Sequence, residues 1–277
     1  MRLRIDLAYD GTDFHGWAVQ PGLRTVQGEL SAALSLALRV PYVGITCAGR
    51  TDTGVHARGQ VVHVDVDADA LQRAAGRSRD LPPEALVRRL NGIIASDIRV
   101  RRVVEAPDGF DARFSALWRR YAYRIADNAE TVDPLTRRHV LAWPRALDLD
   151  AMNEASALLV GRHEFASFCK QREGATTIRT LLDLHWTRDD HGLVVGAVRA
   201  DAFCHSMVRS LVGCLMTIGE GRRPAAWAGE MLHAASRDPA VVVINAHGLT
   251  LEEVAYPADE ELRRRAEETR RRRSVDG

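Results

Sequence analysis

Hydrophobic positions in the first third of the chain recur with two periods, which predicts a fold that mixes strands and helices. Leu3, Ile5 and Leu7 alternate with charged residues, as in a strand with one buried face. Thr25 can cap a helix with apolar residues at helical spacing, and Pro82 suits the first turn of another. Further strands are predicted over residues 43–47, 60–66 and 98–104. Together these elements predict one β-α-β-β-α-β-like unit.

The rest of the chain repeats this pattern with longer insertions. Strands are predicted over residues 119–125, 181–186 and 193–198, and helices over 203–218 and 224–235. Asp148 or Asp150 can cap a further helix that runs through Leu159. The fold class is therefore α+β. We expect three parts: 1–105, 106–258, and a charged tail over 259–277 that forms a solvated helix fraying into disorder.

Composition is that of a soluble intracellular protein. The chain has 277 residues and a formal net charge of +1, and it contains no apolar run long enough to span a membrane. The four cysteines form no C-x-x-C pair and are expected to be reduced core thiols. The histidines form no H-E-x-x-H motif or cysteine–histidine cluster, so no metal site is expected.

Positive charge comes almost entirely from arginine, because Lys170 is the only lysine. We attribute this mainly to a genome-wide bias. Residues 113–124 are more informative, since they combine four arginines with four aromatic residues and no acidic residue. Basic groups interleaved with aromatic rings suit a nucleic-acid surface. A buried strand with a charged outer face explains the same pattern, and both interpretations can hold together.

The segment Gly49-Arg50-Thr51-Asp52-Thr53-Gly54-Val55-His56 carries the clearest candidate chemistry. Its glycines allow a tight turn, and the strand that follows can hold the Asp52 carboxylate rigidly. One carboxylate placed in this way suits a nucleophile or a base. The alternative is a surface loop in which Asp52 caps its own turn.

This segment resembles the G-R-T-D-A-G-V-H motif of the tRNA pseudouridine synthase A family, with Thr53 in place of the usual alanine. Cys204 and Ser206 depart from the family's usual F-L-x-H-M-V-R or F-V-H-H-M-V-R motif. The resemblance covers residues 3 to about 256. The other matching blocks, in the same order as in the family, are Tyr9-Asp10-Gly11-Thr12-Asp13-Phe14-His15-Gly16-Trp17 with Gln20, Phe110-Asp111-Ala112-Arg113-Phe114-Ser115-Ala116, Arg119-Arg120-Tyr121-Ala122-Tyr123, Gly161-Arg162-His163-Glu164-Phe165-Ala166-Ser167-Phe168-Cys169, Phe203-Cys204-His205-Ser206-Met207-Val208-Arg209 and Gly248-Leu249-Thr250-Leu251.

The resemblance implies an isomerase that converts uridine to pseudouridine at positions 38, 39 and 40 of the tRNA anticodon stem and loop. It also implies two RNA-recognition-like, ferredoxin-like halves that form a continuous antiparallel sheet flanked by helices, with a central cleft. A cytoplasmic homodimer that binds tRNA is expected, and a near-zero net charge does not oppose such association. The reaction requires no cofactor and no metal.

The family's site residues map onto this chain by motif. Asp52 is implied to be the nucleophile, and Arg209 its cationic partner. Tyr121 is implied to stack on the flipped uracil and to be a candidate base, whereas an ordinary core tyrosine is the alternative. Arg50 is implied to assist base flipping, which costs a few kcal/mol.

Two residues are implied to line the pocket. Leu249 is expected to pack against the target base. His205 is expected to contact the pocket or the RNA, and a hydrogen-bonded core histidine explains it equally well.

Two other classes of protein share parts of this pattern. A non-catalytic RNA-binding module shares the basic and aromatic surface but does not need Asp52. An aspartate-nucleophile phosphatase needs a D-x-D motif after the first strand and Mg²⁺ ligands, and 65–67 and 148–150 offer that spacing only in the wrong context.

Overall fold

The computed structural model describes residues 1–170, 176–234, 236 and 238–275. The chain forms two compact units, one made of Met1–Leu117 with Leu251–Arg272 and the other of Trp118–Thr250 with the residues from Arg273 on. The first unit therefore extends past the expected boundary at residue 105 and takes in a segment near the C-terminus. Both units combine helices with mostly antiparallel strands, which confirms the α+β class.

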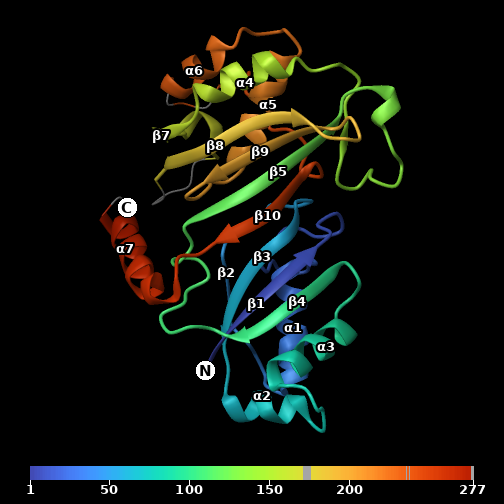
Figure 1. The fold of residues 1–277 in the computed structure, drawn as a ribbon, viewed down its shortest axis with the longest axis vertical. Coiled ribbons are helices and arrows are strands. Elements are labelled where there is room, and N and C mark those ends of the chain that lie inside the picture. The colour runs from blue at the N-terminus through green and yellow to red at the C-terminus, as the bar shows by residue number, and fades with distance from the viewer. Residues whose placement is uncertain (171–175, 235, 237, 276–277) are drawn as a thin grey trace. The chain divides into compact units, whose positions relative to one another are not determined.

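The first unit is built around four strands and a neighbouring fifth (Figure 1). β1 pairs antiparallel with β3 and with β4, β2 pairs antiparallel with β3, and β10 lies next to β3. The order of the first four strands is thus β4-β1-β3-β2. Its elements are β1 (Arg2–Tyr9), α1 (Val26–Leu38), β2 (Ile45–Cys47), β3 (His56–Asp65), α2 (Ala68–Ala75), α3 (Pro82–Ile93), β4 (Ile98–Glu105), β10 (Leu249–Ala255, in this unit from Leu251 on), the 3₁₀ turn η3 (Asp259–Glu261) and α7 (Leu262–Val275).

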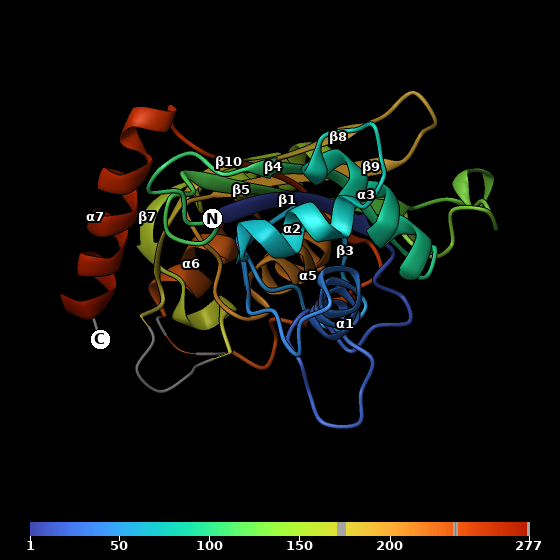
Figure 2. The same ribbon diagram turned by 90° about the horizontal axis from the view of Figure 1, so that it is seen from below.

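The predicted strands and caps of this unit are confirmed. In β1 every second side chain is buried, as the alternation predicted. The Thr25 hydroxyl accepts a hydrogen bond from the Gly28 amide at 3.3 Å, which caps α1. Pro82 occupies the first turn of α3. Figure 2 shows α1 on one side of β1, and the apolar residues along one face of α1 are buried.

The second unit has its own antiparallel strands, in the order β5-β9-β8-β7, with the short β6 parallel to β5. Figure 2 shows α5 and α6 on one side of β5, β8 and β9. Its elements are β5 (Trp118–Ala126), η1 (Ala129–Thr131), β6 (Leu141–Ala142), α4 (Leu149–Ala157), β7 (Gly161–Glu164), η2 (Ala166–Phe168), β8 (Ile178–Arg188), β9 (Val194–Ala200), α5 (Met207–Gly219) and α6 (Ala226–His233).

Helix α5 begins at Met207, four residues later than predicted. Its N-cap, Ser206, has a φ of 64° and so adopts the left-handed conformation, which no helix interior tolerates. The Met207 amide donates to the Cys204 carbonyl at 3.1 Å, so the preceding residues form a separate turn. Residues 203–206 are therefore a loop that leads into the helix.

The helix expected in the C-terminal segment is present, but its first turns are partly buried and not fully solvated. α7 is helical from Leu262 to Val275, and Leu262 and Ala266 are buried against the first unit. The Ser115 hydroxyl donates to the Leu262 carbonyl at 3.1 Å, and Arg270 donates to the Asp111 carboxylate at 2.6 Å. Leu262 and Ala266, one turn apart, are too few buried apolar positions to stand out in a highly charged sequence.

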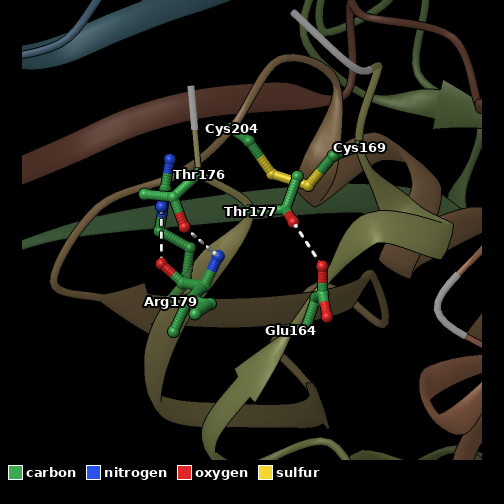
Figure 3. The surroundings of a disulfide bond; sticks show 7 residues. Glu164, Cys169, Thr176, Thr177, Arg179 and Cys204 are labelled. Carbon is green, nitrogen blue, oxygen red and sulfur yellow. Dashed lines mark hydrogen bonds between the residues drawn. A yellow bond between two sulfur atoms is a disulfide. The ribbon is translucent and has the colours of Figure 1, made fainter. Parts of the chain in front are cut away.

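The expectation that all four cysteines are reduced was wrong. Cys169 and Cys204 form a disulfide, with their Cα atoms 5.7 Å apart (Figure 3). Cys47 and Cys214 are buried thiols outside this disulfide, as expected. No helix within the described ranges combines the length and the apolar character needed to cross a bilayer.

Candidate active site

Asp52 lies in the first unit, on the loop between β2 and β3, and its side chain is half-buried. The Asp52 carbonyl accepts from the Val55 amide at 3.1 Å, and Gly54, with a φ of +77°, completes this tight turn. The turn places the aspartate directly before a long buried strand. A carboxylate held there has little freedom to move.

A polar network under the loop fixes its backbone. The Gln60 amide group, fully buried on β3, donates to the Gly49 carbonyl at 2.8 Å and to the Tyr9 hydroxyl at 3.3 Å. The Tyr9 hydroxyl in turn lies 2.8 Å from the Thr51 hydroxyl. Both residues that flank Arg50 are thereby tied to strands β1 and β3. Buried bonds of this kind hold one geometry because breaking any of them leaves an unsatisfied polar group.

The N-terminal motif packs against the same loop from the other side. The Trp17 amide donates to the Thr51 carbonyl at 3.0 Å. A Cβ on Gly16, whose φ is +87°, would approach that carbonyl to 3.0 Å and the Thr53 nitrogen to 3.2 Å. Glycine is required at position 16 both for the backbone conformation and for this close approach. The N-terminal motif therefore shapes the Asp52 loop.

Tyr121 lies in the second unit, on β5, and is 7% exposed. Its ring meets the ring of Phe203 edge to face, with centroids 5.1 Å apart. Such a contact restrains the orientation of an aromatic ring. Phe203 belongs to the loop that leads into α5, so this loop positions the tyrosine.

Arg209 lies on the first turns of α5 and is half-buried. Its Nε donates to the Ile244 carbonyl at 2.7 Å, and the Ile244 amide donates to the Arg209 carbonyl at 3.3 Å. This reciprocal pair fixes the Arg209 side chain as far as the Nε of its guanidinium group. Gly213, one turn further, allows the neighbouring segment to approach, because a Cβ there would lie 1.9 Å from the Val242 carbonyl oxygen.

The segment 244–248 makes hydrogen bonds both to α5 and to β5. The Tyr123 hydroxyl donates to the Asn245 carbonyl at 2.7 Å, and the Arg124 amide donates to the Gly248 carbonyl at 3.0 Å. A Cβ on Gly248 would lie 2.7 Å from the Tyr123 ring, so only glycine fits. Burial raises the pKa of Tyr123 strongly, and the Arg209 charge acts in the opposite direction. Tyr123 is thus a neutral hydrogen-bond donor at neutral pH.

The remaining predicted residues fall in both units. Arg50 is exposed on the Asp52 loop. Leu249 is buried at the start of β10, directly after the segment 244–248. His205 is half-buried, and its carbonyl accepts from the Lys170 amide at 3.0 Å. Tyr121, Arg209 and Leu249 thus lie in the second unit, whereas Asp52 and Arg50 belong to the first.

The sequence analysis did not assign roles to the residues that brace these side chains. Gln60 appeared only as a member of an alternating strand, and Tyr123 only as part of a motif. The glutamine at a strand position expected to be buried was the one signal in the sequence for this supporting role, because a buried amide side chain needs hydrogen-bond partners. In the part of the chain that the structure describes, histidine, cysteine and carboxylate side chains do not gather in groups of three that could hold a metal ion.

Comparison with known proteins gives a consistent result. A family model described as tRNA pseudouridine synthase matches residues 155–257. A tRNA pseudouridine synthase A of Streptomyces griseus is 58% identical over 280 residues, covering 100% of this chain and 95% of the relative. The proteins of that name from Frankia casuarinae and Mycobacterium leprae are 56% and 52% identical, covering 98% and 99% of this chain and 94% and 96% of the relatives.

Proposed function

Since the chain belongs to the tRNA pseudouridine synthase A family, we propose that it converts uridine to pseudouridine at positions 38, 39 and 40 of the tRNA anticodon stem and loop. The reaction breaks the bond between uracil N1 and ribose C1′ and forms a bond between C5 and C1′. C5 loses a proton and N1 gains one, so substrate and product have the same atoms. No cofactor or second substrate is needed.

Asp52 is the proposed nucleophile, and it either attacks ribose C1′ or acts through a glycal route. This proposal rests on the buried hydrogen bonds that support the Asp52 loop. The Gln60 amide group and the hydroxyl groups of Tyr9 and Thr51 make these bonds. Reactive groups must be held to within a fraction of an ångström, and rigid supporting contacts provide that precision. A loop that merely connects two strands needs no such buried support.

We assign Arg209 as the cationic partner of Asp52. A carboxylate in a dry pocket remains ionised when an opposite charge lies close to it. Arg209 is suited to this role because α5 is largely buried and because its Nε is already held by the Ile244 carbonyl. Only a modest part of its side chain remains to be ordered.

Tyr121 is the proposed platform for the flipped uracil and a candidate proton acceptor. The edge-to-face contact with Phe203 supports the first role, since it restrains the orientation of the Tyr121 ring. Leu249 is proposed to pack against the same base, and His205 to contact the pocket or the RNA. Arg50, exposed on the Asp52 loop, is proposed to help flip the base and to fill its vacated place.

The strand order β4-β1-β3-β2, with α1 and α3 as the intervening helices, supports a ferredoxin-like first half. The order β5-β9-β8, with α4 and α5, supports a similar second half. We propose that the two halves share one continuous sheet around a central cleft. We further propose that the enzyme acts in the cytoplasm as a homodimer, and a monomer mass in light scattering at working concentration would contradict the dimer.

The test is incubation of the EDTA-treated protein with an unmodified tRNA transcript, followed by mapping of pseudouridine. We expect product at positions 38–40. Asp52→Asn should abolish turnover and leave tRNA binding intact, because the amide keeps the size and loses the nucleophile. Asp190→Asn, in the exposed turn between β8 and β9, is a matched control that should retain turnover. Product at another tRNA site, or full turnover by Asp52→Asn, would contradict the proposal.

A further inference from the structure

The Cys169–Cys204 disulfide connects two loops that lie next to proposed site residues. Cys204 directly follows Phe203, whose ring contacts Tyr121. Five residues further along, α5 carries Arg209. Cys169 follows the 3₁₀ turn η2, and the next amide, that of Lys170, donates to the His205 carbonyl. The covalent bond and this hydrogen bond thus join the same two loops side by side.

The two sulfur positions differ in their surroundings. Cys169 is 3% exposed, whereas Cys204 is half-buried. Figure 3 shows Thr176 and Thr177 beside the disulfide, and Thr177 donates to the Glu164 carboxylate at 3.3 Å. The bond therefore borders polar and partly exposed groups. A small reagent can reach it through Cys204.

A disulfide is unexpected in an enzyme of this kind. This step rests on the proposed function, because an enzyme that modifies tRNA works in a cytoplasm that keeps thiols reduced. Disulfides that do form in such a compartment are usually transient and redox-sensing. Cys47 and Cys214 are buried elsewhere in the fold, so the pairing is specific to these two residues.

We propose that Cys169 and Cys204 are a redox modification site whose oxidation state controls how firmly the loop 203–206 holds Tyr121. A peroxide oxidises the Cys204 thiolate to a sulfenic acid, and the Cys169 thiol displaces water to form the disulfide. In total two thiols and one hydrogen peroxide give one disulfide and two water molecules. A dithiol reductant reverses the change by exchange, leaving two thiols and its own oxidised ring.

The expected consequence is a change in substrate affinity. With the disulfide formed, Phe203 is restrained against Tyr121 and the base-binding ring is pre-ordered. Without it, binding must order this loop. We expect reduction to raise KM for tRNA roughly two- to tenfold, the range for ordering one or two side chains, and to leave kcat within about twofold.

The first experiment follows the bond itself and needs no tRNA. The full-length protein is treated with hydrogen peroxide or with dithiothreitol, and intact mass, peptide mapping and thermal unfolding are recorded. Oxidation should lower the mass by about 2 Da, join the peptides of Cys169 and Cys204, and raise the Tm by about 4–16 °C. Absence of the cross-linked peptide would overturn the modification site, whatever reaction the protein catalyses.

The second experiment measures kcat and KM for a tRNA transcript in both redox states. Cys204→Ser and Cys169→Ala should show the KM of the reduced protein and should not respond to peroxide, whereas Cys214→Ala should keep the full response. An equal KM in the two states would overturn control of the site. If no pseudouridine forms in either state, the proposed function fails and the mass and Tm results still decide the redox pair.

Discussion

Replacing Gln60 by leucine should loosen the Asp52 loop without altering any residue proposed to touch the substrate. Leucine nearly matches glutamine in size and keeps the buried position on β3 filled. It removes the donor that now serves the Gly49 carbonyl at 2.8 Å and the Tyr9 hydroxyl at 3.3 Å. The Tyr9–Thr51 hydroxyl pair then loses one of its anchors.

The size of the effect follows from these two bonds. A hydrogen bond contributes about 1 kcal/mol net, and a buried group left without its partner costs about 1–3 kcal/mol. The variant should therefore lose roughly 2–4 kcal/mol of unfolding free energy, or about 4–16 °C in Tm. A displacement of about 1 Å in a reacting group can cost on the order of a hundredfold in rate, so kcat should fall even where the variant is fully folded.

Two measurements are compared for the variant and the parent. Single-turnover pseudouridine formation is measured at a temperature well below both unfolding transitions, and thermal unfolding is recorded separately. Gln72→Leu is the matched control, because Gln72 is exposed on α2, and its Tm should stay within about 1–2 °C of the parent. A lower Tm with an unchanged rate constant would show that Gln60 supports the fold and does not position Asp52. An unchanged Tm would show that the two bonds carry no net energy.

Three further predictions address individual charges. Arg209→Met should leave Asp52 without its counter-charge and lower turnover, with a cost of about 3–5 kcal/mol if the pair is buried, and a rate near that of the parent would exclude the pair. Arg50→Ala should slow pseudouridine formation at a paired stem uridine more than at an unpaired loop uridine. Arg50→Lys should recover little of that rate, because an ammonium group cannot stack. Equal slowing at both targets would exclude the flipping role. Asp127 accepts two hydrogen bonds from Arg188, and these bonds hold the pKa of the Asp127 carboxyl below its usual value although burial acts in the opposite direction. The ionised carboxylate therefore stabilises the folded state fully above the unfolded-state pKa, and this stabilisation is lost as the pH falls through the lowered folded-state pKa. Asp127→Asn should thus cost about 1–3 kcal/mol at neutral pH, and urea denaturation should show the difference shrinking below about pH 4.

Local signals in the sequence predicted most of the strands and helices. The Thr25 cap and the proline at the start of α3 both depend on side chains near in sequence, and each was found as expected. The boundary of α5 was missed because Ser206 adopts a left-handed conformation that no sequence pattern required. The Cys169–Cys204 bond was missed because 35 positions separate the two residues and their spacing matches no known motif.

The candidate reactive residues were predicted by a different route from the residues that support them. Family motifs predict Asp52 and Tyr121 as site residues, because the proposed chemistry restricts which side chains can stand there. Gln60 and Tyr123 act through carbonyl groups that lie far away in sequence, and a backbone carbonyl leaves no trace in residue identity. Only the folded chain shows which donor reaches which carbonyl.

The supporting contacts also suggest how this site keeps its precision although its side chains stand on loops. Gly49 is held from β3 and Thr51 from β1, so the residues around Arg50 inherit the rigidity of two strands. In the second unit, Tyr123 and Arg209 bind successive carbonyls, those of Asn245 and Ile244, so one short segment ties a strand to a helix. Each loop is thereby fixed at two points to regular structure, and between those points only one or two residues remain adjustable. A reaction that must release, turn and reattach a base needs adjustable contacts to the base and fixed contacts to the sugar, and this division between short free stretches and anchored ends provides both.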